Sequence, residues 1–250
     1  MSVIPTFLQE FFWANQDLLW LATLAADLGL TVLMYRLFGK QGLLASIVLA
    51  ILLSNLQGPK LTIIFGMQTS LGVIFYSSIF FATDLLSEQY GRAEANRAVL
   101  IGFTASVIIV FMLSLALLFQ PSTRPETAEF SADIHAAFIS ILDFTPRFVF
   151  GSLFAYLISQ SFDVWFFHKI KKLTNGRHLW LRNNLSTMAS QTIDTLLYSL
   201  IVWWGVVDLQ TAIQLGLVKY GFKLAIAAFD TPFIYWARSW SHRDNSVHSQ

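Results

Sequence analysis

Long apolar segments, broken by short polar ones, fill most of the chain. We interpret seven of them as membrane-spanning helices, each of which needs about 20 mostly apolar residues. Pro232 is expected to kink or break the last span near its end. The predicted spans cover residues 18–36, 42–57, 69–88, 95–119, 146–168, 184–206 and 211–237. The pattern predicts an all-α fold, a polytopic integral membrane bundle of about seven transmembrane helices.

The composition agrees with a membrane protein. Of the 250 residues, 55% are hydrophobic and 12% are charged, against about 25% charged residues in a soluble domain. The mean hydropathy is +0.58. The chain has no cysteine, which excludes disulfides and thiolate metal sites. A net charge of +1 without a long basic tract gives no indication of nucleic-acid binding.

Basic residues give the orientation of the bundle. Eleven Lys and Arg residues fall in the loops and tail on one side of the predicted spans, and three fall on the other side. Loops rich in Lys and Arg stay in the cytoplasm. The C-terminus is therefore expected in the cytoplasm and the N-terminus outside.

The longest external connection, residues 120–145, carries an amphipathic pattern. Phe130, Ile134, Phe138 and Ile141 follow one another at spacings of 4, 4 and 3. This favours a short helix on the outer membrane surface, and an ordinary ordered loop is the alternative.

Polar side chains form a stripe on the span at 184–206. Asn184, Thr187, Gln191, Asp194 and Tyr198 are spaced by 3, 4, 3 and 4 residues, so they share one helical face. Asp194 lies twelve residues beyond the basic loop, about 18 Å into the membrane at 1.5 Å per residue. The stripe therefore reaches about the midplane of the bilayer.

The preceding span, 146–168, carries a matching stripe that ends with Gln160 and Asp163, the latter nearer the cytoplasm. The stretches SQSFD (159–163) and SQTID (190–194) are nearly the same in the two spans. Charged residues inside membranes usually line a cavity or a bundle interior. We interpret the facing stripes as the wall of a substrate cavity, with plain hydrogen bonding between helices as the alternative.

Further polar residues lie in the other spans. The candidate substrate-binding residues are Asn55, Asp84, Arg147, Gln160, Asp163, Asn184, Gln191, Asp194 and Lys223. Several have a structural alternative: Lys223 in a neutral pair with an aspartate, Arg147 in a helix-start pair with Asp143. Asp27 is expected to pair with a neighbour. Glu88 and the basic loop 168–182 are expected to be solvated charge.

Catalytic and cofactor motifs are absent from the sequence. It holds no GxxxxGK[ST] phosphate loop, no zinc motif and no GxSxG elbow. No enzyme activity, catalytic residue, cofactor or metal is therefore expected, and transport driven by ATP would require a partner chain.

Four stretches together resemble the queuosine precursor transporter family, also called the vitamin uptake transporter family. They are FFATDLLSEQYG (80–91), PRFVFGSLFAYLISQSFDVWFF (146–167), HLWLRNNLSTMASQTIDT (178–195) and YGFKLAIAAFDTPFIY (220–235). The resemblance implies import of the 7-cyano and 7-aminomethyl 7-deazaguanines across the bacterial cytoplasmic (inner) membrane. It also implies a six-helix core, here residues 41–238, preceded by an extra N-terminal span within residues 1–40 and followed by a cytoplasmic tail, 239–250.

A guanine-like base suits the polar stripes. Its adjacent N–H donors fit a carboxylate, its carbonyl fits an amide or Arg, and its face fits an aromatic ring. We expect a midplane site between the third, fifth and sixth spans that works by secondary or facilitated transport. The alternatives are a substrate-binding subunit of a multi-chain vitamin importer and, less favoured, a retinal-binding photoreceptor using Lys223. The expected partners are a purine-like small molecule and the lipid bilayer, and a homodimer is the default assembly.

Overall fold

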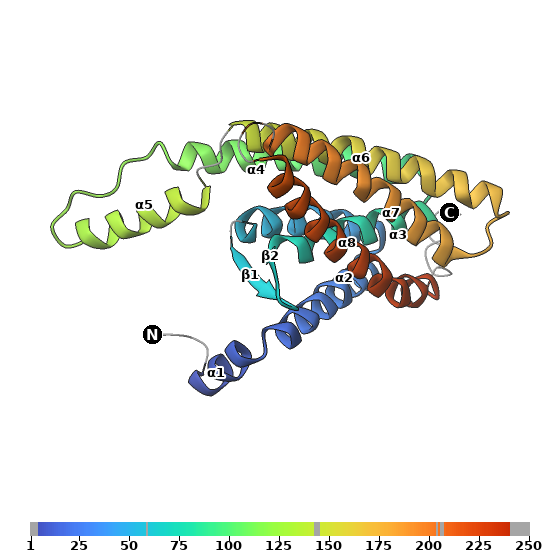
Figure 1. Ribbon diagram of the computed structural model, residues 1–250, viewed down its shortest axis with the longest axis horizontal. Coiled ribbons are helices and arrows are strands. Elements are labelled where there is room, and N and C mark those ends of the chain that lie inside the picture. The colour runs from blue at the N-terminus through green and yellow to red at the C-terminus, as the bar shows by residue number, and fades with distance from the viewer. Residues whose placement is uncertain (1–4, 59, 143–145, 204, 206–207, 241–250) are drawn as a thin grey trace, which may run out of the picture.

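The chain forms a helical bundle with one small hairpin (Figure 1). The computed structural model describes residues 5–58, 60–142, 146–203, 205 and 208–240, without the side chains of 146–150, 202, 203, 211, 212 and 215. The helices are α1 (Thr6–Ala14), α2 (Gln16–Gln57), α3 (Gly72–Gln89), α4 (Arg92–Ala116), α5 (Ala128–Leu142), α6 (Pro146–Leu173), α7 (Leu179–Tyr198) and α8 (Leu209–Arg238). A π-helical turn, η1 (Ser199–Trp203), extends α7, and two strands, β1 (Leu61–Ile64) and β2 (Met67–Ser70), form the hairpin. The mainly helical fold that the sequence predicts is confirmed.

Over the described residues each predicted span overlaps a helix, although the span 69–88 begins in β2, and the first two spans share one helix. The helix α2 is 42 residues long and bends at Gly39, whose φ of 56° and ψ of −133° are not helical. Glycine adopts a positive φ without steric cost, which allows the bend at this position. The bend divides α2 into two arms that match the spans 18–36 and 42–57. Among the described helices, α2 and α4 meet the length and apolar composition of a membrane span.

The hairpin between α2 and α3 is absent from the sequence prediction. The strands pair antiparallel with Leu61 opposite Ser70 and Ile64 opposite Met67. Phe65 and Gly66 between them have φ values of 50° and 73°, the positive values that a tight two-residue β-turn needs. The Phe65 N–H donates to Asp17 Oδ1 at 2.8 Å, which ties the hairpin to the start of α2.

The helix α3 forms the centre of the bundle. Fifteen of its residues are buried, and it packs against α2, α4, α6 and α8. Small residues such as Ser78 and Ala82 let neighbouring helices approach closely. Ser78 Oγ donates to Asp27 Oδ2, so α2 and α3 are joined inside the bundle. The prediction that Asp27 pairs with a neighbour is confirmed.

Two local expectations have different outcomes. The amphipathic segment does form a helix, α5, which lies apart from the bundle (Figure 1). Its apolar residues Phe130 and Phe138 are exposed, and contact with the membrane surface stays a prediction. Pro232 does not break the last span, because α8 continues through it to Arg238.

Replacing Gly42 tests the bend in α2. An added Cβ would lie 2.0 Å from the backbone oxygen of Met34, so Gly42→Ala should overpack the bend and lower stability by about 1–3 kcal/mol or more. Gly29, in the same helix, has nothing within 4 Å of an added Cβ, and Gly29→Ala should raise stability by about 0.5–1 kcal/mol. Thermal unfolding of both variants in detergent measures this. Equal midpoints would show that the bend tolerates the methyl group.

Candidate functional site

The two similar motifs meet where α6 packs against α7 (Figure 1). Ser190 Oγ donates to Asp163 Oδ1 at 2.8 Å, and Ser159 Oγ donates to Asp194 Oδ1 at 3.4 Å. The serine of each motif therefore binds the aspartate of the other. Each serine lies four residues, about one helical turn, before the aspartate of its own motif. Because α6 and α7 run in opposite directions, the serine of one helix lies level with the aspartate of the other. All four side chains are buried.

Asp194 also forms an ion pair with Lys223, which joins α7 to α8. Both side chains are buried, and the Lys223 ammonium lies 5.3 Å from the centre of the Tyr76 ring. Asp194 therefore has a charged partner, whereas no cation pairs with Asp163 among the described residues. Asp163 has Ser190 as a hydrogen-bond donor.

The same face of α7 meets two more aspartates nearer its N-terminal end. Thr187 Oγ1 donates to Asp84 Oδ2 at 3.3 Å, and Asn183 Nδ2 donates to Asp230 Oδ1 at 2.9 Å. Both aspartates are buried. One helix therefore supplies hydrogen bonds to α3, α6 and α8 at successive turns.

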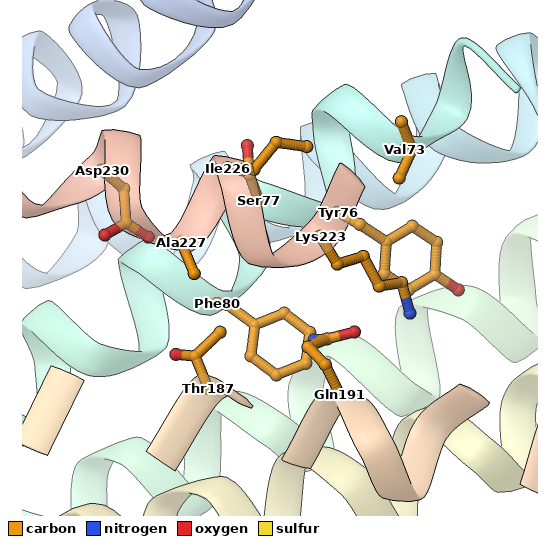
Figure 2. A pocket seen from close by; sticks show the side chains of 10 residues that line it. All are labelled: Val73, Tyr76, Ser77, Phe80, Thr187, Gln191, Lys223, Ile226, Ala227 and Asp230. Atoms are coloured by element: carbon orange, nitrogen blue, oxygen red, sulfur yellow. The ribbon is translucent and has the colours of Figure 1, made fainter. Parts of the chain in front are cut away.

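A narrow cavity opens between α3, α7 and α8 (Figure 2). Lys223, Tyr76 and Gln191 lie toward one end, and Asp230 and Thr187 toward the other. The lining residues are Val73, Tyr76, Ser77, Phe80, Thr187, Gln191, Lys223, Ile226, Ala227 and Asp230. The space has room for about one water molecule, so a two-ring heterocycle fits only if the helices move apart.

The side chain of Gln191 has an unsatisfied acceptor in this cavity. It is buried, and its Oε1 has no hydrogen-bond partner among the described residues. A buried polar atom without a partner costs about 1–3 kcal/mol. A ligand N–H that reached Gln191 would remove this cost.

Residues 70–237 match the family described as "Putative vitamin uptake transporter". The chain belongs to this family. Every residue that lines the cavity lies within the matched range. The resemblance seen in the sequence is therefore confirmed, and the chain is a member of a family of membrane transporters.

Curated relatives agree with the family. The "Probable queuosine precursor transporter" of Bacillus subtilis (strain 168) is 36% identical over 211 residues, 84% of this chain and 89% of the relative. The "Queuosine precursor transporter" of Escherichia coli (strain K12) is 29% identical over 167 residues, 66% of this chain and 70% of the relative. No solved structure matches the chain.

Of the candidate residues, Gln191 and Lys223 line the cavity and Asp194 is paired to Lys223 beside it. The third wall of the cavity is α8, whereas the sequence placed the site between the spans that are α3, α6 and α7. The stripe of α6 instead packs against α7 in the bundle interior. There Asp163 binds Ser190, and Gln160 is buried with no hydrogen-bond partner among the described residues.

The other candidates lie further from this cavity. Asp84 is buried behind Thr187. Asn184 Nδ2 donates to Thr231 Oγ1 at 2.8 Å and links α7 to α8. Asn55 lines a second space, between α2, α3, α4 and α6. Arg147 lies in the first turn of α6, and its side chain and its proposed partner Asp143 fall outside the described residues.

The cavity residues that are not among the candidates include Tyr76, Thr187 and Asp230. Thr187 belongs to the polar stripe of α7, so its spacing gave a usable signal. Asp230 and Lys223 are seven residues apart, two turns on one face of α8, which gave a similar signal. Tyr76 has no such signal, because aromatic residues are frequent throughout the chain.

Glu88 is the centre of an ion network at the end of α3. Its side chain is 6% exposed and pairs with Arg182 at 2.7 Å, Lys171 at 3.0 Å and Arg238 at 3.3 Å. Arg182 is fully buried and also donates to the carbonyl oxygens of Gly176 and Arg177. The expectation of solvated charge is therefore wrong for Glu88 and for Arg182 of the adjoining loop. The network ties α3, α6, α7 and α8 together.

Removing the charge of Glu88 tests this network. Glu88→Gln leaves the buried Arg182 guanidinium without its carboxylate, which should lower stability by about 3–5 kcal/mol. Glu94 pairs with Lys40 at 3.2 Å with both side chains about a third exposed, and Glu94→Gln should cost at most about 1 kcal/mol. Thermal unfolding compares the two variants. A Glu88→Gln midpoint equal to that of Glu94→Gln would show that the network adds no stability.

Proposed function

We propose that the chain is a multi-pass transporter of the bacterial inner membrane that imports 7-deazaguanine precursors of queuosine by secondary or facilitated transport. The names of the curated relatives support the substrate class. The main observation in support of this site is that Gln191, a buried amide, has an oxygen without a hydrogen-bond partner among the described residues. It lines a cavity beside the Asp194–Lys223 ion pair.

The cavity offers what a guanine-like base requires. Gln191 Oε1 is placed to accept a ring N–H, and Asp230 presents a carboxylate at the other end for the adjacent N–H donors. Phe80 and Tyr76 supply aromatic faces, and stacking of a base on such a face contributes about 1–3 kcal/mol in nucleic-acid binders. An amide and a carboxylate that bind a polar edge also reject analogues without that edge.

The proposed membrane topology follows the loops. The basic side, with the Glu88 network, faces the cytoplasm, and the N-terminus lies outside. The proposed boundary between an added N-terminal span, 1–40, and a core, 41–238, falls beside the bend at Gly39. Large apolar side chains on the outside of α4, such as Phe111 and Met112, are exposed and suit contact with lipid. Of the proposed tail, 239–250, residues 241–250 lie outside the described residues.

Transport requires the cavity to widen, because its present space holds about one water molecule. On the proposed cytoplasmic side the Glu88 network holds α3, α6, α7 and α8 together. Release of the substrate to that side therefore requires at least some of these ion pairs to break.

Exchange by the purified chain tests the function and the role of Gln191. Liposomes that contain the chain and unlabelled 7-cyano-7-deazaguanine should take up the labelled compound, in competition with the 7-aminomethyl compound and not with biotin. Gln191→Ala should raise the half-saturating concentration roughly tenfold, the effect of about 1.4 kcal/mol. Gln214→Ala, an exposed position on α8, is the matched control and should change nothing. Activity that appears only with a second chain would favour the subunit of a multi-chain importer.

A double variant separates ligand binding from packing at Asp194. Asp194→Asn leaves the Lys223 ammonium buried without a counter-ion, so both stability and exchange should fall. Adding Lys223→Met removes the unpaired charge and should restore the unfolding temperature while exchange stays low. Recovery of exchange in the double variant would show that the pair is only structural.

A further inference from the structure

Asp84 of α3 and Asp163 of α6 lie against each other in the interior of the bundle. Both side chains are fully buried, and their carboxyl groups are in hydrogen-bonding contact. Thr187 and Ser190, one turn apart on α7, each donate a hydroxyl to one of the two aspartates. The remaining oxygens, Asp84 Oδ1 and Asp163 Oδ2, have no donor among the described residues.

The charged groups around this carboxyl pair do not neutralise it. On α8 the facing charge is a third aspartate, Asp230, which adds negative potential. On α7 the groups that face the two aspartates are the hydroxyls of Thr187 and Ser190. Two buried cations of the described chain have other partners: Arg182 pairs with Glu88 and Lys223 pairs with Asp194.

Two carboxylates in contact cannot both be ionised at low cost, because like charges repel strongly where water is excluded. A shared proton removes one charge and supplies a hydrogen-bond donor between the two carboxyl groups. The arrangement therefore has the chemistry of a proton-binding site.

The carboxyl pair is also connected to the cavity. Thr187 lines the cavity and donates its hydroxyl to Asp84. Ser190, which holds Asp163, is the residue before Gln191. A movement of α7 together with α6 that admits a ligand therefore changes the Thr187–Asp84 bond and the contact between the two carboxyl groups.

We propose that the Asp84–Asp163 pair carries the proton that drives uptake, an inference that rests on the proposed transport function. In the outward-facing state the pair binds one proton from outside and holds it as one carboxylic acid hydrogen-bonded to one carboxylate. When the bundle opens inward, the O–H bond breaks and the proton passes to cytoplasmic water. The charge of the pair then changes from −1 to −2. Asp194 has no such role, because Lys223 neutralises it.

A pH gradient across liposomes tests the proposal, with labelled 7-cyano-7-deazaguanine as the probe and the membrane potential held at zero. For one proton per neutral substrate, an outside more acidic by one pH unit should drive accumulation of at most about tenfold. In Asp163→Asn the amide N–H takes the place of the shared proton, so the contact and the fold are retained. Accumulation should fall to the equilibrium level while exchange of labelled for unlabelled compound continues.

A pH-sensitive dye inside the liposomes gives a second readout. Substrate added outside should acidify the interior with the native chain and not with Asp163→Asn. Asp133→Asn, an exposed position on α5, is the matched control and should accumulate substrate and protons as the native chain does.

The outcomes separate the two proposals. If the native chain shows no exchange, the proposed function itself fails. If it exchanges but a sodium gradient, and not a pH gradient, drives accumulation, the proton-binding site is wrong and the function stands. Accumulation driven by the pH gradient in both Asp84→Asn and Asp163→Asn would also overturn the role of the pair.

Discussion

Charged side chains buried in this bundle need oppositely charged or hydrogen-bonding partners within the bundle. The arrangement of the helices follows from that constraint. Moving an ion out of water costs several kcal/mol even after the protein relaxes. The ion pairs Arg182–Glu88 and Lys223–Asp194 offset this cost. The aspartates that remain rely on hydroxyl and amide donors. A helix rotated away from these contacts would leave buried charges unpaired.

The helix α7 is the element through which most of these contacts pass. From Asn183 to Asp194 its polar residues are spaced by three or four, so they lie on one side, and with Arg182 they reach three different helices at successive levels. Their partners are Glu88 for Arg182, Asp230 for Asn183, Asp84 for Thr187, Asp163 for Ser190 and Lys223 for Asp194. The orientation of α7 therefore fixes the rotations of α3, α6 and α8 relative to one another.

The sequence predicts the helices and the polar stripes well, because both follow from periodicity. It predicts that Asp27 has a partner without naming Ser78, and its candidates Gln191 and Lys223 line the cavity. It predicts that the stripes of 146–168 and 184–206 face each other, as they do, but not how α3 and α8 lie against them, since this depends on the rotation of each helix. The cavity therefore has α8 as a wall in place of α6. The hairpin at 61–70 was missed because its short apolar strands look like part of a loop leading into a span.

The near-repeat of SQSFD and SQTID acquires a physical meaning from the exchange of partners between them. Because Ser159 binds Asp194 and Ser190 binds Asp163, neither helix can slide along the other without losing both bonds at once. The pair α6–α7 is therefore expected to move as one unit. Any opening of the cavity then has to separate α7 from α3 or from α8. Beside the cavity these boundaries are held by the Thr187–Asp84 bond and the Asp194–Lys223 ion pair. Opening of the cavity therefore breaks at least one of these two contacts, and release toward the proposed cytoplasmic side also breaks ion pairs of the Glu88 network.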